Sequence, residues 1–181
     1  ARRIRDRFSA EPFRVLVPLP ETADVNSVRT ALKSIPGSAE LDPRVSRGDA
    51  WAAIRAADAG IVKSGTSSLE AALLDLPHVV VYRAHPVSEF VFRNVIRYRK
   101  SISLTNLIAD APIVPELILG DFSPERMAEE VGALLGPGSE SRVGKMRSGF
   151  DRIRRVLGER SPSERVAEEI LDLADGRGGL G

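Results

Sequence analysis

The sequence has no cysteine, only two histidines and almost no net charge. Without cysteine, disulfide bonds and thiolate metal sites are excluded. The histidines, His78 and His85, flank one expected strand, and no carboxylates are spaced around them as a zinc site would require. The formal net charge of +1 gives no overall field to attract nucleic acid. We therefore expect neither a metal site nor a nucleic-acid partner.

Long apolar runs are absent as well. No stretch approaches the roughly 20 apolar residues that cross a bilayer. The opening stretch, "ARRIRDRFSAEPF", is rich in arginine but lacks the apolar segment of a signal peptide. We therefore expect a soluble, cytoplasmic protein. Its 181 residues, 43% hydrophobic and 28% charged, suffice for one domain with a real core plus an appendage.

Short apolar runs alternate with helical patterns from Phe13 to about Gly136. Strands are expected at residues 13–20, 59–64 and 78–83, with a further short strand at 38–42. Helices are expected at residues 24–35, 48–58, 67–76, 86–100 and 125–136. Residues 102–117 are expected to form a loop and a short strand. The consecutive valines 79–81 are typical of a strand covered on both faces. This alternation predicts parallel βαβ units in a three-layer α/β fold.

Residues 137–181 differ, because they contain helical patterns and no strand. A helix over residues 141–160 would have an apolar face made of Val143, Met146, Phe150, Ile153 and Leu157. A last helix begins at Ser161, which forms a capping box with Glu164. The apolar face of this last helix consists of Val166, Ile170 and Leu173.

The stretch "AGIVKSGTSSLE" (59–70) contains a strand end, a glycine turn and a helix start. Ligands of parallel sheets bind beyond the carboxyl ends of the strands, and the N–H groups at a helix start favour phosphate. Gly65 would let a ligand approach the backbone, and the hydroxyls of Ser64, Thr66 and Ser67 could add donors. A second interpretation needs no ligand, because Ser67 and Glu70 have the spacing of a capping box.

Two further polar residues fall near the same edge of the expected sheet. Arg83 ends the strand after Gly65, and arginine suits a bidentate phosphate contact. Asn106 could contact a base or a sugar. The alternatives are a solvated surface arginine and an asparagine that only shapes a turn.

The stretch "EFVFRNVIRYRK" (89–100) predicts a basic amphipathic helix. Arg93, Arg97 and Lys100 gather on one face, which could lie on an anionic membrane surface. The alternative is that the apolar face packs on the sheet and the basic face is only solvated.

Several stretches, in this order, resemble one family closely: "VLVPL", "SGTSSLEAAL", "VVVYR", "SLTNLIA", "VPELIL" and "DFSPE". They are similar to the carboxyl-terminal half of the lipid-A-disaccharide synthase family, which are GT-B glycosyltransferases. The resemblance implies a Rossmann-like three-layer parallel sheet, incomplete at its amino terminus and followed by carboxyl-terminal helices. Residues 1–136 would be the UDP-sugar-binding domain without its first strand and loop. Residues 137–181 would be a helical segment that packs back toward an absent amino-terminal domain.

The family joins UDP-2,3-diacylglucosamine to 2,3-diacylglucosamine 1-phosphate, giving lipid A disaccharide 1-phosphate and UDP. By similarity, the diphosphate would be lined by Ser64, Gly65, Thr66 and Ser67. Glu70 would accept hydrogen bonds from the ribose hydroxyls, and Arg83 and Asn106 would lie near the donor. The resemblance implies no metal and no cofactor, because a helix dipole and cationic side chains can stabilise the leaving diphosphate.

The chain departs from the family pattern in two ways. It lacks the family's Pro-Gly-Ser-Arg loop, and it lacks the amino-terminal domain that would bind the acyl acceptor and supply the catalytic base. We therefore expect no catalytic residue in this chain and no activity from it alone. The resemblance also implies a peripheral protein at the inner membrane of a Gram-negative bacterium, and it leaves an oligomer open.

Two other functions are compatible with the residues. One is a sugar-nucleotide enzyme similar to UDP-N-acetylglucosamine 2-epimerase, although that family has a Gly-Gly pair and a double glutamate where this chain has Gly65-Thr66 and the single Glu70. The other is a non-catalytic α/β binding module. UDP binding would separate the module from both enzymes.

Overall fold

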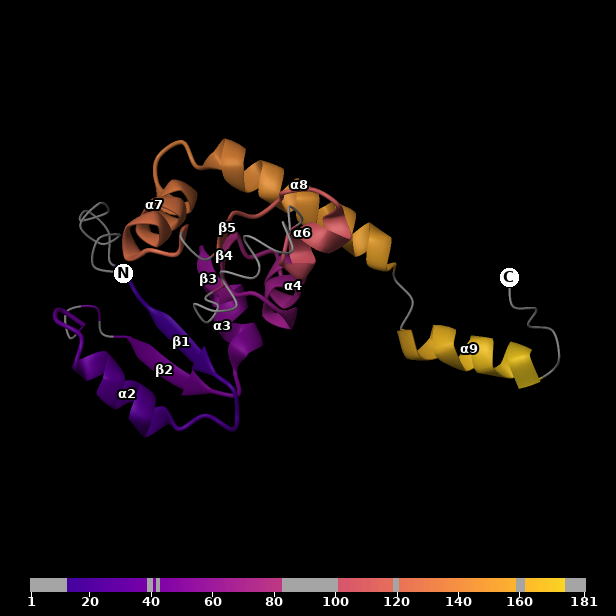
Figure 1. The fold of residues 1–181 in the computed structure, drawn as a ribbon, viewed down its shortest axis with the longest axis horizontal. Coiled ribbons are helices and arrows are strands. Elements are labelled where there is room, and N and C mark those ends of the chain that lie inside the picture. The colour runs from indigo at the N-terminus through magenta and orange to yellow at the C-terminus, as the bar shows by residue number, and fades with distance from the viewer. Residues whose placement is uncertain are drawn as a thin grey trace, which may run out of the picture.

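The computed structural model describes residues 13–38, 41, 43–82, 101–118, 121–158 and 162–174. Strands and helices alternate within them, as the sequence predicts (Figure 1). The strands are β1 (Leu16–Leu19), β2 (Arg44–Arg47), β3 (Gly60–Lys63), β4 (His78–Tyr82) and β5 (Glu116–Ile118). The helices are α2 (Val25–Lys33), α3 (Ala50–Ala56), α4 (Thr66–Leu73), α6 (Leu104–Ala109), α7 (Pro124–Leu135), α8 (Glu140–Leu157) and α9 (Pro162–Ala174).

The described strands pair only in parallel. β1 pairs with β2, and β3, β4 and β5 form a second sheet in that order. Parallel neighbours need a crossover connection, which α2 supplies between β1 and β2 and α4 between β3 and β4. The predicted α/β class with parallel sheets is confirmed.

The core is centred on β4. Val79 and Val80 are completely buried, and because successive strand residues point to opposite faces, both faces of β4 are covered. Helices α4 and α7 contact β3 and β4, while α8 packs on α4, α6 and α7. The helices add to the core the buried side chains of Ala72, Val131, Leu134, Met146, Phe150 and Ile153.

Most of the strand expected at residues 38–42 lies outside the described residues, and neither Ser38 nor Leu41, which are described, belongs to a strand. The N–H of Ser38 donates to the carbonyl of Ile35, and the N–H of Leu41 donates to that of Ser38, both at 3.1 Å. At Ser38 and Leu41 the backbone N–H groups are thus used in turns and not in a sheet. Strand β2 then begins where the Arg44 N–H donates to the Val15 carbonyl at 2.8 Å.

The region expected to be a loop with a short strand holds β5 but also the short helix α6. Ser103 is the N-cap of α6, and its hydroxyl accepts a hydrogen bond from the Asn106 N–H at 3.2 Å. Asp110 ends the helix in a left-handed conformation, with φ of 48°. The helix expected at residues 125–136 is found as α7, with Ser123 as N-cap and Pro124 in its first turn.

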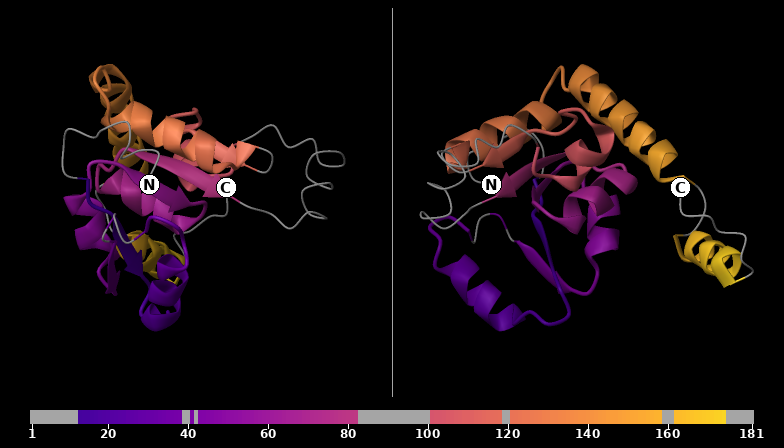
Figure 2. Two further views of the ribbon diagram at one scale, coloured as in Figure 1. Left: turned by 90° about the vertical axis from the view of Figure 1, so that its left-hand side faces the viewer. Right: turned by 45° about the vertical axis from the view of Figure 1, so that its right-hand side comes forward.

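The expected apolar face of α8 is confirmed for Met146, Phe150 and Ile153, which are buried. It is wrong for Leu157, which is 40% exposed. The reason is that the end of α8 projects beyond the sheet, so its last turn has little to cover (Figure 2). Helix α9 lies apart from the other elements, and the side chains of its apolar face are exposed, namely Val166, Ile170 and Leu173. The basic helix expected at residues 86–100 lies outside the described residues.

Candidate functional site

The glycine turn lies at the carboxyl end of β3, where the sequence places it. Ser64 follows the strand, and its N–H still bonds the Val81 carbonyl of β4 at 2.9 Å. Gly65 then adopts φ of 140° and ψ of −159°, and α4 begins at Thr66. No atom lies within 4 Å of a Cβ built on Gly65, so the backbone conformation, and not lack of space, requires glycine here.

The start of α4 is open, and the capping box expected between Ser67 and Glu70 is wrong. The N-cap is Gly65, which has no side chain to cap the helix. Ser67 and Glu70 are therefore the second and fifth helical residues, too far into the helix to cap it. Among the described residues, no group accepts from the N–H of Thr66 or Ser67. These N–H groups and the positive end of the helix are thus free for an anion.

The hydroxyls of this loop have different surroundings. Ser68 is completely buried, and its hydroxyl donates to the Gly65 carbonyl at 2.8 Å, which stabilises the turn from inside. Thr66 and Ser67 are exposed, and Glu70 is half-buried. The carboxylate of Glu70 accepts no hydrogen bond from the described part of the chain. The polar groups that remain available are therefore those that the sequence predicts to contact a ligand.

Ser64 connects the loop to the neighbouring segment. Its hydroxyl donates to the Ile102 carbonyl at 3.1 Å. The Ile102 N–H donates in turn to Oε2 of Glu116 at 3.1 Å. The position of the glycine turn is thus tied to the first residue of β5.

Glu116 holds the start of α6 with its second oxygen, Oε1. This oxygen accepts from the N–H of Ser103 at 3.0 Å, from the Ser103 hydroxyl at 2.6 Å and from Nδ2 of Asn106 at 2.9 Å. The sequence analysis gave Glu116 no role. No local pattern could have found it, because its helix-start partner Ser103 lies 13 residues earlier in the chain.

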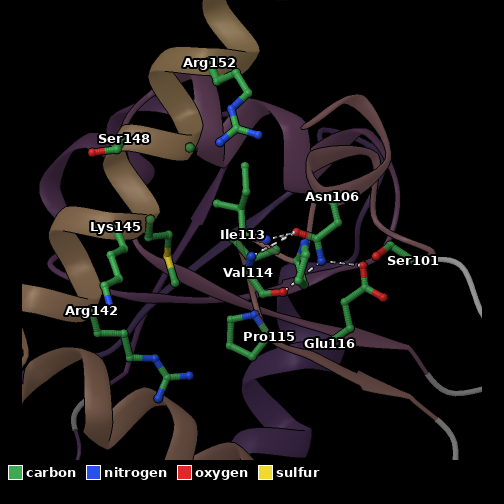
Figure 3. Close-up of a pocket in the computed structure, with 13 residues that line it drawn as sticks. Ser101, Asn106, Ile113, Val114, Pro115, Glu116, Arg142, Lys145, Ser148 and Arg152 are labelled. Carbon is green, nitrogen blue, oxygen red and sulfur yellow. Dashed lines mark hydrogen bonds between the residues drawn. The ribbon is translucent and has the colours of Figure 1, made fainter. Parts of the chain in front are cut away.

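Asn106 lies beside the same network and is 2% exposed (Figure 3). Its Nδ2 also donates to the Val114 carbonyl at 2.9 Å. Its Oδ1 accepts from the N–H groups of Ile113 and Val114 at 2.8 and 2.9 Å. The amide therefore uses all of its hydrogen-bonding capacity inside the chain.

The structure thus brings together Ser64, Gly65, Thr66 and Ser67, with Glu70 one turn further along α4. Asn106 joins them only through Glu116 and Ile102. The other predicted site residues lie outside the described residues, namely Arg83, Arg93, Arg97 and Lys100. Across the described ranges, no helix is long and apolar enough to cross a membrane.

Comparison with known proteins gives one consistent result. A family model described as "Lipid-A-disaccharide synthetase" matches residues 13–167. A lipid-A-disaccharide synthase of Myxococcus xanthus is 38% identical over 92% of this chain and 42% of its own length. Those of Anaeromyxobacter dehalogenans and Gloeothece citriformis are 40% and 33% identical, over 93% and 95% of this chain.

The chain spans less than half the length of these curated relatives, 42% or 43% in each case. Their names do not favour an epimerase or a non-catalytic binding module. The match to the family model covers most of the chain and includes the open start of α4, Asn106 and Glu116. The chain therefore belongs to the lipid-A-disaccharide synthase family.

Proposed function

We propose that the protein transfers a hexosyl group from UDP-2,3-diacylglucosamine to 2,3-diacylglucosamine 1-phosphate, and that this chain supplies the UDP-sugar site. The products would be lipid A disaccharide 1-phosphate and UDP. The observation that carries the proposal is the open start of α4 behind Gly65, at the carboxyl end of a parallel strand. Family membership supports the choice of reaction, a hexosyl transfer by a glycosyltransferase.

In this proposal, the diphosphate lies over the turn formed by Ser64, Gly65, Thr66 and Ser67. The free N–H groups of Thr66 and Ser67 donate to phosphate oxygens, and the exposed hydroxyls add further donors. When the glycosidic bond breaks, negative charge develops on the UDP leaving group. The positive end of α4 stabilises that charge without having to reorganise, which favours the transition state over the bound donor.

Glu70 binds the ribose in this proposal. Its carboxylate has no competing donor among the described residues, so both oxygens can accept from the two ribose hydroxyls. Arg83 follows Tyr82, the last residue of β4, and contacts a phosphate. Asn106 acts by holding the segment from Ile113 to Glu116 in place. A direct contact between Asn106 and the donor would break one of its four internal hydrogen bonds.

The remaining functions need a second domain, for which the greater length of the relatives leaves room. That domain binds the acyl acceptor and carries the catalytic base, and the helical segment 137–181 packs back toward it through the apolar face of α9. We propose that Arg93, Arg97 and Lys100 hold the protein on the anionic surface of the inner membrane, facing the cytoplasm. Replacing all three by glutamate should abolish co-sedimentation with anionic vesicles, and unchanged co-sedimentation would remove this part of the proposal.

The reaction is tested by measuring disaccharide formation from the two lipid substrates. We expect no turnover by the 181-residue chain alone and turnover when the chain is joined to an acceptor-binding domain of a relative. Turnover by the chain alone at an ordinary enzymatic rate would contradict the proposed division of labour. Release of UDP without a disaccharide product would contradict the proposed reaction.

A further inference from the structure

A pocket of about 580 Å³ lies between α8 and the segment that connects α6 to β5 (Figure 3). One wall is a face of α8, and the other contains residues 112–116 together with Asn106 and Ser101. No residue of the stretch 64–70 lines it, so the pocket is separate from the glycine turn. The proposed donor site does not account for it.

The α8 wall is cationic. Arg142, Lys145 and Arg152 all line the pocket, and their spacings of three and seven residues place them on one face of the helix. Arg142 pairs with Glu130. Among the described residues, Lys145 and Arg152 have no carboxylate partner. Two positive charges beside the pocket are therefore not neutralised by the described part of the chain.

Two other arginines of α8 lie on a different face of the helix and are neutralised by carboxylates. Arg147 and Arg154 both pair with Asp75, at 2.9 and 3.3 Å, and Arg154 also pairs with Asp151. Among the described residues, Arg147 and Arg154 are therefore neutralised, whereas Lys145 and Arg152 beside the pocket have no carboxylate partner. Arg155, which does not line the pocket, has none either.

The opposite wall does not supply the missing negative charge. Glu116 is the one acidic residue among the described residues that line the pocket. Its two oxygens already accept four hydrogen bonds, from Ile102, Ser103 and Asn106. Glu116 is thus committed to the start of α6 and does not pair with Lys145 or Arg152, whose positive charges stay available to an anion.

The floor of the pocket is apolar. Ile113, Pro115 and Met146 all line it. Ile113 reaches α8 because residue 149 is glycine, where a Cβ would lie 2.5 Å from the Ile113 side chain. A ligand that fills the pocket would therefore contact cations on one side and carbon atoms beneath.

We propose that this pocket binds a phosphate ester whose phosphate contacts Arg152 and whose apolar group lies on Ile113 and Met146, with Lys145 adding positive charge further along the same wall (Figure 3). The guanidinium of Arg152 can hold two phosphate oxygens, and the Lys145 ammonium adds a point charge. The apolar group removes the carbon floor from water, which an inorganic phosphate ion cannot do.

Calorimetric titration with octyl phosphate below its micelle concentration tests the proposal, with inorganic phosphate, glycerol phosphate and octyl glucoside as comparison ligands. We expect octyl phosphate to bind about tenfold more tightly than any of the three. A Lys145→Gln/Arg152→Gln variant should bind octyl phosphate about tenfold more weakly, because it loses hydrogen bonds to a charged group. Both residues are exposed, so the variant should fold normally.

Arg126→Gln/Arg155→Gln is the matched control, because it removes two exposed cations that do not line the pocket. An equal loss of binding in the control, or no loss in the pocket variant, would overturn the proposal. Equal affinity for glycerol phosphate or inorganic phosphate would overturn the role of the apolar floor. UDP binding should be the same in both variants, and its loss in the pocket variant would show that the pocket belongs to the donor site.

Discussion

Asn106 and Glu116 show how two polar residues position a loop through hydrogen bonds within the chain. Asn106 binds the backbone of Ile113 and Val114, and Glu116 binds the backbone of Ile102, whose carbonyl accepts from Ser64. Buried polar groups of this kind are stabilising only when all of their partners are in place. The position of Ser64 therefore depends on residues 38 to 52 positions further along the chain.

Among the described residues, His78 is the one ionisable side chain that is completely buried. It is completely buried at the start of β4, and its ring stacks on Phe150 with centroids 5.6 Å apart. Its Nδ1–H donates to the Leu76 carbonyl at 2.8 Å, while Nε2 has no partner among the described residues. Burial disfavours the charged ring and lowers the pKa of His78 from 6.5 to about 4.

The lowered pKa predicts that acid destabilises the fold. Between pH 6.5 and about 4 the unfolded chain binds a proton at His78 that the folded chain does not. The stabilising contribution is therefore complete above pH 6.5 and is lost progressively as the pH falls toward 4, by an amount on the order of 3 kcal/mol. Urea unfolding across this range should give a steeper pH dependence for the wild type than for His78→Phe. Parallel pH dependences would contradict the account.

The positions of single residues could be predicted where they follow directly from the order of elements along the chain. Ser64, Gly65, Thr66 and Ser67 follow a strand directly, so their place at the sheet edge could be read from the sequence. The cap of α4 could not, because the backbone conformation of Gly65 starts the helix two residues before the expected Ser67 cap. The role of Glu116 was also out of reach, since its partners come together only in the folded chain.

At the scale of elements, the contact between α8 and the α6–β5 segment depends on one glycine. A Cβ at Gly149 would lie within 2.8 Å of three Ile113 side-chain atoms. Gly144, on the same helix, has no atom within 4 Å of such a Cβ. Replacing Gly144 by alanine therefore changes only the helix propensity of α8, whereas replacing Gly149 by alanine also changes its packing against Ile113.

Gly149→Ala should destabilise the protein, while Gly144→Ala should not. Alanine in a helix interior is favoured over glycine by up to about 1 kcal/mol, which Gly144→Ala should gain. At Gly149 the overlap with Ile113 should cost about 1–3 kcal/mol and outweigh that gain. Urea unfolding of the two variants checks the difference. Stabilisation by both substitutions would show that Ile113 can move aside at little cost.

The elements that the sequence predicted correctly are those whose apolar residues recur at a regular spacing. Helices α4, α7 and α8 and strands β3 and β4 have apolar residues at regular spacing, and each was found. Helix α6 was missed because it has only six residues, too few for a visible period. Hydrogen bonds to other parts of the chain stabilise α6. Glu116 accepts from the Ser103 N–H at the helix start, and the Thr105 hydroxyl donates to the Ser68 carbonyl at 2.7 Å.

At the scale of the whole molecule, the described residues combine a core around β4 with a last helix whose apolar face is exposed. The core encloses β4 and ends at Ile153 of α8. Beyond it, α9 exposes Val166, Ile170 and Leu173, each by more than half of its surface. This exposed apolar face is the surface that the proposed second domain would cover, and the chain spans 42% or 43% of the length of these relatives.

The central claim is that the open start of α4 binds UDP with help from Glu70. Calorimetric titration of UDP into the wild type, Glu70→Ala and the control Glu129→Ala tests it most directly. Glu129 is an exposed glutamate of α7, so its removal changes the charge equally without touching the turn. Urea unfolding of the same three proteins measures whether the fold is affected.

We predict that Glu70→Ala weakens UDP binding by about tenfold or more, because it removes charge-assisted hydrogen bonds to the ribose. Its free energy of unfolding should fall by less than about 1 kcal/mol, since Glu70 does not cap α4. Glu129→Ala should bind UDP as the wild type does. Equal UDP affinity in Glu70→Ala and the wild type would contradict the account and leave this stretch as a helix start alone.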